Sequence, residues 1–302
     1  MLKWPEYLIL RPWGKLYIGQ CHCLKRNCDL FIMRTTFKLF VVCGLACLWI
    51  VLTLTGVVEY PEIFKEMAGQ TKEINWKTVD LYNKPLPETI KSSKGNVAVA
   101  TKTIIVENIK VFYREAIPPE GVSVSGQSVL LLHGRAFSSE TWEKLETLNV
   151  LAALGHRVVA VDLPGYGNTK EKFIGNRADF MVSLFDALSL KDAHPVLVSP
   201  SMSGEYSVVF LKDHSNMISG YVPVAPVATN SLSHSELQKV VVPTLIVYGS
   251  EDNTGLAEAS LQNLQVLPNS REIKIEGAGH PAYLNQPAVF HKLLHNFLQL
   301  LK

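Results

Sequence analysis

The sequence predicts an α/β domain built on a mostly parallel sheet of eight strands with helices on both faces, preceded by one transmembrane helix. Two observations carry this prediction. From about residue 97 onward, short runs rich in Val, Leu and Ile alternate with polar or helical stretches, which is typical of strands buried on both faces of a sheet. Nearer the N-terminus, twenty residues pass without a charge, which matches the thickness of a bilayer core.

The charge-free stretch, 39–58 (LFVVCGLACLWIVLTLTGVV), follows a basic segment and precedes Glu59, Glu62 and Glu66. The positive-inside tendency therefore predicts a single-pass type II signal-anchor, with the N-terminus in the cytoplasm and the remaining chain in the lumen or outside the cell. Two alternatives stay open. The stretch is a buried core helix of a cytoplasmic protein, or it is a signal peptide cleaved near Gly56, which would make the protein secreted.

The chain accordingly divides into a cytoplasmic basic tail (1–38), the anchor (39–58), a stalk or linker (59–96) and the α/β domain (97–302). The stalk lacks sustained periodicity and ends in the linker-like PLPETIKSSKGN. Translation from Met1 or from Met33 stays open.

All five cysteines lie in the first 47 residues, so the α/β domain cannot form an internal disulfide. Cys21, Cys23 and Cys28 are candidates for reversible acylation next to the membrane. The alternatives are inert thiols or a metal knuckle, whose spacing is too tight for regular tetrahedral coordination. We expect no metal and no cofactor. The formal net charge of +2 is the sum of a basic N-terminal tail and a slightly acidic remainder. An acidic domain argues against a nucleic-acid partner. Oligomeric state is not predicted.

The α/β domain opens with two β-rich runs, 97–106 and 109–116, separated by Glu-Asn, which predicts a hairpin. Six further strand candidates follow: SVLLLHG, RVVAVDLPG, HPVLVSP, ISGYVPVAP, PTLIVYGSED and REIKI. Among the helical stretches, SSETWEKLETLNVLAALGH has a Ser N-cap and a Gly stop, and PAVFHKLLHNFLQLLK ends the chain. The connection 227–242 has room for one short helix, so no lid domain is expected.

Functional groups collect at the carboxyl ends of strands in such sheets, and there the sequence offers a serine, an acid and a histidine in chain order. A nucleophilic hydrolase needs a hydroxyl, a base that takes its proton and an acid that orients the base. We assign these roles to Ser201, Asp252 and His280. The histidine lies in a glycine-containing loop after the last strand. Glu251 competes with Asp252, which is favoured for its shorter side chain and its position three residues after Gly249.

The strand end SPSMSG contains three serines and lacks the G-x-S-x-G pattern of serine hydrolases. A nucleophile at the apex of a tight strand-to-helix turn needs small residues two positions before and two after it. Centring on Ser199 places Leu197 at a small position, and centring on Ser203 places Glu205 there. Only Ser201 has small residues on both sides. For the two backbone N–H donors of an oxyanion hole we expect Met202 and Arg135, with Ala136 as the alternative to the latter.

Together, LLLHGRAFSSETW, VDLPGYGNT, VYGSED and GAGHPAYLNQP resemble the motifs of the α/β-hydrolase superfamily over roughly residues 97–302. VSPSMSG, HGRAFSSETW and GAGHPAYL resemble more closely the α/β-hydrolase domain-containing protein 14 subfamily, in which S-x-S-x-S-G replaces G-x-S-x-G. The subfamily has a soluble member and a membrane-anchored member, and this chain resembles the membrane-anchored one more closely. The resemblance implies the α/β-hydrolase fold with a minimal cap and the same triad. Asn285 departs from many superfamily members, which carry an acid after the histidine.

The expected function is a membrane-anchored serine hydrolase that forms an acyl-enzyme at Ser201. With no lid, the site suits small acyl esters, thioesters or acylated amines, either free or carried by a protein, better than long lipid chains. Two alternatives remain, a non-catalytic interaction protein that keeps the fold and an acyltransferase whose acceptor is not water.

Overall fold

The computed structural model describes residues 8–9, 17–18 and 74–301 and divides the chain into two units, 1–73 and 74–302. In the first unit, β1 (Leu8–Ile9) pairs antiparallel with β2 (Tyr17–Ile18). The predicted anchor 39–58, Met33 and the five cysteines lie outside the described residues. Among the residues that are described, no helix is both long enough and apolar enough to cross a bilayer.

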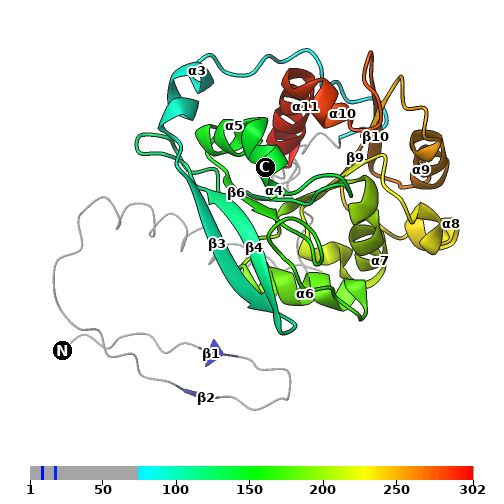
Figure 1. Ribbon diagram of the computed structural model, residues 1–302, viewed down its shortest axis with the longest axis horizontal. Helices are drawn as coiled ribbons and strands as arrows, with labels where there is room; N and C mark the ends of the chain where they lie inside the picture. The colour runs from blue at the N-terminus through cyan, green and yellow to red at the C-terminus, as the bar shows by residue number, and fades with distance from the viewer. Residues whose placement is uncertain (1–7, 10–16, 19–73, 302) are drawn as a thin grey trace, which may run out of the picture. The chain divides into compact units, whose positions relative to one another are not determined.

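The second unit is built on a sheet of eight strands in the order β10-β9-β8-β7-β5-β6-β4-β3. β4 pairs antiparallel with both of its neighbours, and the remaining pairs are parallel. This confirms the predicted mostly parallel eight-stranded sheet (Figure 1). The strands are β3 (Val99–Val106), β4 (Ile109–Ala116), β5 (Ser128–Leu131), β6 (Arg157–Val161), β7 (Val196–Pro200), β8 (Gly220–Val224), β9 (Thr244–Gly249) and β10 (Ser270–Ile275).

The predicted hairpin forms as β3 and β4, joined by Glu107 and Asn108. Both turn residues have positive φ, 47° and 63°, which matches the twist of a two-residue hairpin turn. The central strands β5 and β7 are buried along their whole length. Buried on both faces, they account for the continuous apolar runs of the sequence.

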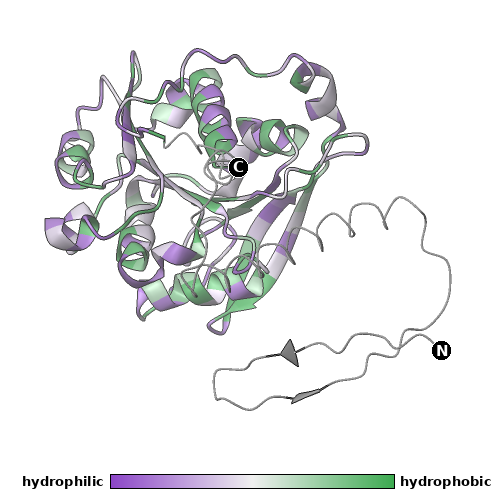
Figure 2. Ribbon diagram, turned by 180° about the vertical axis from the view of Figure 1, so that it is seen from behind, coloured by the Kyte–Doolittle hydropathy of each residue, from purple (hydrophilic) through white to green (hydrophobic). Residues whose placement is uncertain are grey.

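Helices cover both faces of the sheet. One core cluster contains residues of α6 (Arg177–Ala187), α7 (Gly204–His214), α8 (His234–Leu237) and α9 (Leu256–Leu264). A second cluster contains residues of α4 (Ser139–Lys144), α5 (Thr147–Ala153), α10 (Ala282–Asn285) and α11 (Pro287–Leu300). The terminal helix α11 carries hydrophobic and hydrophilic stripes side by side (Figure 2). Most of its residues are buried, because its apolar side packs in the core of the domain and Asn296 on its polar side donates to the carbonyls of Leu81 and Lys84.

The stretch 138–156, which reads as one helix, is interrupted in the structure. Ser138 caps α4 by accepting a hydrogen bond from the Glu140 N–H, and Gly155 stops α5 with a φ of 93°. Between them, Glu146 adopts a left-handed φ of 56° and starts α5 in a new direction. The break lets Trp142 of α4 donate its indole N–H to the Leu132 carbonyl, 2.7 Å away, while α5 packs along the sheet.

The described part of the predicted stalk, 74–96, belongs to the folded unit. It contains α3 (Ile90–Ser93) and the short 3₁₀ helix η1 (Lys94–Asn96). Lys77 donates to the carbonyls of Gln265 and Leu267 at 3.0 and 2.9 Å, and Trp76 packs edge-on against Phe297 at 5.7 Å. The folded unit therefore begins at Ile74 and not at 97, because apolar residues spaced irregularly through 74–96 find partners on α5 and α11.

The other connections are short. Residues 227–242 hold the 3₁₀ helix η4 (Thr229–Ser231) and the four-residue α8, as the lidless prediction requires. The remaining 3₁₀ turns are η2 (Ser201–Ser203) and η3 (Ser215–Met217). The β6–α6 connection, 162–176, contains no helix or strand, and it lies at the same edge of the sheet as the carboxyl ends of β5 and β7.

Candidate active site

Ser201 stands where β7 ends and η2 begins. Its φ is +50°, a left-handed conformation that a residue with a side chain adopts at a cost of about 1 kcal/mol or more. The turn is held from outside, because the Val227 N–H donates to the Ser201 carbonyl at 2.9 Å. Gly204 opens α7 directly against this loop, and a Cβ there would lie 2.2 Å from the Val227 oxygen. Glycine is therefore required at position 204, one residue further from the nucleophile than the second glycine of G-x-S-x-G.

The structure brings Ser201, His280 and Asp252 together from the ends of three different strands. His280 Nε2 lies 2.8 Å from Ser201 Oγ, and His280 Nδ1 lies 2.8 Å from Asp252 Oδ2. An ionised carboxylate only accepts hydrogen bonds, so Nδ1 carries the proton. Nε2 is then the acceptor for the Ser201 hydroxyl. This is the arrangement in which a histidine can take a proton from a serine.

Asp252 is the acid that faces the histidine. Its side chain is fully buried, whereas that of His280 is about one-fifth exposed. Burial raises the pKa of Asp252, but hydrogen bonds from Thr254 and His280 together outweigh it and hold the pKa below its ordinary value. Thr254 donates its hydroxyl at 2.6 Å and its backbone N–H at 2.9 Å, both to Asp252 Oδ1. Glu251, the rival candidate, is exposed to solvent.

The loop that carries His280 is fixed on both sides. The Asn285 side-chain oxygen accepts a hydrogen bond from the Gly279 N–H at 2.9 Å. At the end of β9, Gly249 approaches the same loop so closely that a Cβ would lie 2.2 Å from the Ala278 and Gly279 oxygens. Asn285 therefore packs the loop by accepting a backbone hydrogen bond.

The backbone amides of Arg135 and Met202 flank the nucleophile. Both residues follow strands that are neighbours in the sheet, β5 and β7. Gly134 packs directly on Ser201, since a Cβ there would lie 3.5 Å from Ser201 Cβ. Within residues 74–301, neither amide donates to another backbone or side-chain group. Each is therefore available to a developing oxyanion.

His133 holds the loop that carries Arg135. Its Nδ1 lies 2.9 Å from the Gly134 carbonyl, and its Nε2 accepts the Leu163 N–H at 2.9 Å. Burial lowers the pKa of His133, which keeps the ring neutral with the proton on Nδ1. Asp162, at the end of β6, likewise ties loops together by accepting from the Ser139 and Asn168 amides. Neither residue contacts Ser201.

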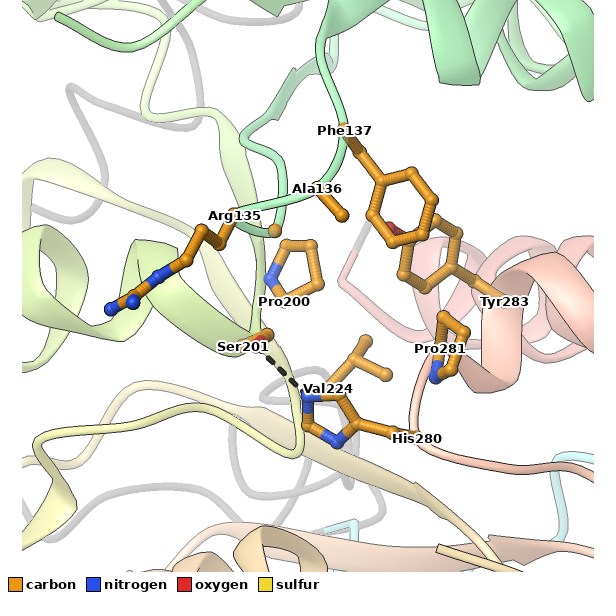
Figure 3. Close-up of a pocket in the computed structure, with 10 residues that line it drawn as sticks. Arg135, Ala136, Phe137, Pro200, Ser201, Val224, His280, Pro281 and Tyr283 are labelled. Carbon is orange, nitrogen blue, oxygen red and sulfur yellow. Dashed lines mark hydrogen bonds between the residues drawn. The ribbon is translucent and has the colours of Figure 1, made fainter. Parts of the chain in front are cut away.

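A cavity of about 160 Å³ opens beside Ser201 and His280 (Figure 3). Its walls are mostly apolar, and the rings of Phe137 and Tyr283 stand edge to face with their centres 6.3 Å apart. Arg135 lines the cavity, but its side chain extends away from the serine and histidine (Figure 3). The ten lining residues are Gly134, Arg135, Ala136, Phe137, Pro200, Ser201, Val224, His280, Pro281 and Tyr283.

Sequence reasoning missed several of these residues. Phe137 and Tyr283 lie in the motifs HGRAFSSETW and GAGHPAYL, but nothing in the motifs says that aromatic rings face the nucleophile. Thr254 follows Asp252 by two residues, and that spacing is typical of a hydroxyl that closes a turn onto an aspartate. Among the described residues, no cluster of three His, Cys, Asp or Glu side chains could hold a metal ion.

The chain matches known proteins over this domain. A model described as "Alpha/beta hydrolase family" covers residues 129–204, and one described as "alpha/beta hydrolase fold" covers 173–287. The rat "Putative protein-lysine deacylase ABHD14B" is 46% identical over 68% of this chain and 98% of its own length. The zebrafish "Protein ABHD14A" is 42% identical over 63% of this chain and 72% of its own.

Solved structures share the fold of this domain. A CIB-like hydrolase from Thermoplasma acidophilum aligns with a TM-score of 0.60 at 27% identity, over 67% of this chain and 99% of its own. The carboxylesterase CesB from Bacillus subtilis aligns at 0.55 and 18% identity, over 70% and 96%. At that identity the second likeness concerns the fold alone.

Proposed function

The chain belongs to the ABHD14 subfamily of the α/β-hydrolases and is a hydrolase, and on this premise we propose that it cleaves acyl compounds through an acyl-enzyme at Ser201. The observation that carries the proposal is the hydrogen-bonded series from Ser201 through His280 to Asp252, with 2.8 Å at each step. The identities to ABHD14A and ABHD14B relatives are similar, so the subfamily is the level at which the chain is placed.

In the proposed mechanism, Ser201 Oγ attacks the acyl carbon while His280 Nε2 takes the hydroxyl proton. The carbonyl oxygen becomes an oxyanion, for which the Arg135 and Met202 amides are the proposed donors. His280 then gives its proton to the leaving amine, alcohol or thiol as the bond to the acyl carbon breaks. A water molecule attacks the acyl-enzyme with the same proton transfers in reverse order, which releases the acid and restores Ser201.

The size of the cavity supports a short acyl group. Its volume of about 160 Å³ is close to that of an apolar cavity that holds one benzene molecule. Phe137, Val224 and Tyr283 supply apolar walls, which suit an acyl chain of a few carbons. With no helix longer than the four-residue α8 between β8 and β9, the leaving-group side stays open.

An acylated lysine side chain is the leaving-group class that we favour. The rat and human relatives carry the name "Putative protein-lysine deacylase". Here the support comes from the open side of the site, which lets a bulky polypeptide approach. A lysine side chain is long enough to present its acyl group to Ser201 while the polypeptide stays at the surface.

Labelling with a fluorophosphonate tests the proposal, because the probe reacts only with an activated serine. We expect the wild type to be labelled and Ser201→Ala to be unlabelled with an unchanged melting temperature. Hydrolysis of short and long p-nitrophenyl esters then measures acyl preference, with the acetyl and butyryl esters cleaved faster than the decanoyl ester. A wild type that resists the probe while an unrelated serine hydrolase reacts would overturn the proposal.

We also propose that 39–58 anchors the chain as a type II membrane protein with the hydrolase domain on the lumenal or extracellular side. The support is the uncharged length and the charge asymmetry around it. Protease treatment of sealed vesicles tests this topology. Residues 74–302 should survive until detergent is added, and digestion of this domain from the cytoplasmic side would contradict it.

A further inference from the structure

Four buried hydroxyl groups stand in a row behind the nucleophile. Ser199 Oγ lies 3.0 Å from Ser203 Oγ and 2.7 Å from Ser207 Oγ, and Ser207 Oγ lies 2.8 Å from the Tyr221 hydroxyl. All four side chains are fully buried. They come from four elements, since Ser199 is on β7, Tyr221 is on β8, Ser203 is on η2 and Ser207 is on α7.

The row ends on a carbonyl, and that end fixes the direction of every hydrogen bond in it. Ser203 Oγ lies 2.7 Å from the Pro200 oxygen, which can only accept, so Ser203 donates its single proton there. Ser199 must then donate to Ser203, Ser207 to Ser199 and Tyr221 to Ser207. Each hydroxyl gives one bond and each serine also receives one. A buried row with every donor used is rigid and costly to disturb.

The accepting carbonyl belongs to the peptide bond that enters the strained residue. Pro200 precedes Ser201, whose φ of +50° places the nucleophile at the apex of the turn. Ser203 therefore fixes the peptide plane before Ser201, while the Val227 N–H fixes the carbonyl after it at 2.9 Å. With both carbonyls held, the peptide planes on the two sides of Ser201 are fixed, including the plane that carries the Met202 N–H.

We propose that Ser199, Ser203, Ser207 and Tyr221, here called the hydroxyl chain, form a positioning device that sets the angle of Ser201. The inference rests on the proposed function. It adds to the size argument from the sequence, because a glycine pair would fit the same turn but could not hold the Pro200 carbonyl. The S-x-S-x-S pattern is then an alternative way to stabilise the elbow, through side-chain hydrogen bonds.

The order of the hydrogen bonds in the hydroxyl chain gives a graded test. Ser203→Ala removes the bond to Pro200, so we expect fluorophosphonate labelling to slow by roughly tenfold or more, since small misplacements of a nucleophile are costly. Tyr221→Phe removes only the first donor and leaves the three later bonds in place, so its labelling rate should stay within about threefold of the wild type. Ser203→Ala loses two buried hydrogen bonds and Tyr221→Phe loses one, so both melting temperatures should fall, that of Ser203→Ala by the larger amount.

Thr244→Val is the matched control for a buried hydroxyl. Thr244 is fully buried at the start of β9, and its hydroxyl donates to the Val242 carbonyl at 3.0 Å. It lies at the opposite edge of the sheet from Ser201. Thr244→Val should lower the melting temperature as the variants of the hydroxyl chain do, but it should leave the labelling rate unchanged.

A double variant, Ser199→Gly with Ser203→Gly, creates G-x-S-x-G in place. We expect it to fold and to label more slowly than the wild type, with kcat for p-nitrophenyl acetate lowered and KM little changed. Labelling of Ser203→Ala or of the double variant at the wild-type rate would overturn the positioning role while the proposed function stands. A wild type that does not label would instead overturn the proposed function.

Discussion

At the scale of single residues, two neighbouring acids provide a direct test of the site. Asp252 is buried and contacts His280, whereas Glu251 is exposed. Asp252→Asn should therefore lower kcat by a factor on the order of 10³ to 10⁴, because the amide favours the wrong histidine tautomer. Glu251→Gln, the matched control, should retain wild-type kcat. Steady-state hydrolysis of p-nitrophenyl acetate measures kcat for both variants. Equal decreases of kcat would show that the assignment of Asp252 as the acid is wrong.

The acid also predicts how the site responds to a lost hydrogen bond. Burial raises the pKa of Asp252 and the Thr254 bonds lower it, so Thr254→Val moves this pKa upward. Protonation of Asp252 removes the charge that stabilises the imidazolium. The Asp252 carboxyl should thus titrate at a higher pH in the variant than in the wild type, with the shift read from the pH profile of its carboxyl carbon chemical shift in an NMR titration. An unchanged profile would mean that the Thr254 backbone N–H is sufficient.

The nucleophile, acid and base were predictable from residue type and chain order alone. Ser201, Asp252 and His280 each follow a recognisable strand, and steric size selected one serine among three. The hydroxyl chain was not predictable, because Ser207 and Tyr221 are separated by fourteen residues and meet only when β8 pairs with β7. Size is a property of one position, whereas a hydrogen-bonded row depends on the register of two strands.

At the scale of elements, the packing of α11 on α5 predicts a pH-dependent stability. His291 of α11 is buried, and its Nε2 lies 2.9 Å from Thr147 Oγ1 of α5. Burial lowers the pKa of His291 to about 4 from the ordinary 6.5. Between these values the unfolded chain binds a proton that the folded chain does not. The free energy of unfolding should therefore fall as pH decreases from about 6.5 to about 4, by an amount on the order of 3 kcal/mol.

Urea unfolding of the wild type and His291→Gln at pH 7 and pH 4.5 measures this contribution. The variant cannot titrate, so it should lose less stability on acidification, although the lost contact makes it less stable at pH 7. His234, exposed on α8, gives the matched control His234→Gln, which should keep the wild-type pH dependence. If the free energy of unfolding changed equally with pH in all three proteins, the titrating group would be a residue other than His291.

The elements themselves were predicted better than their ends. Runs of apolar residues identified the central strands, because a strand buried on both faces is apolar along its whole length. The two hairpin strands, of which β3 is mostly exposed, were predicted instead from β-rich runs on either side of Glu-Asn. The break between α4 and α5 was missed, since Glu146 is an ordinary helix former and its left-handed conformation occurs beside a tertiary contact, the hydrogen bond from Trp142 to the Leu132 carbonyl. Residues 74–96 were assigned to a stalk for the same reason, that their order comes from tertiary contacts.

At the scale of the whole domain, the sheet assembles a site from residues far apart in the chain. Ser201 and His280 are 79 positions apart, yet β7 and β10 deliver them to one edge because parallel strands end together. No residue of 74–96 lines the cavity at that edge. Residues 74–96 therefore contribute to the stability of the domain and do not line its candidate active site.

Truncation separates these two contributions. A chain that begins at Val97 loses three buried apolar side chains, Trp76, Leu81 and Ile90, each worth roughly 1.5–3 kcal/mol. For a domain of this size the melting temperature should fall by about 10 °C or more relative to a chain that begins at Ile74. Below its melting temperature the shorter chain should still label with a fluorophosphonate, because Ser201 and its partners are intact. Equal melting temperatures for the two chains would return 74–96 to the role of a linker, and loss of labelling in a folded shorter chain would tie the segment to the site.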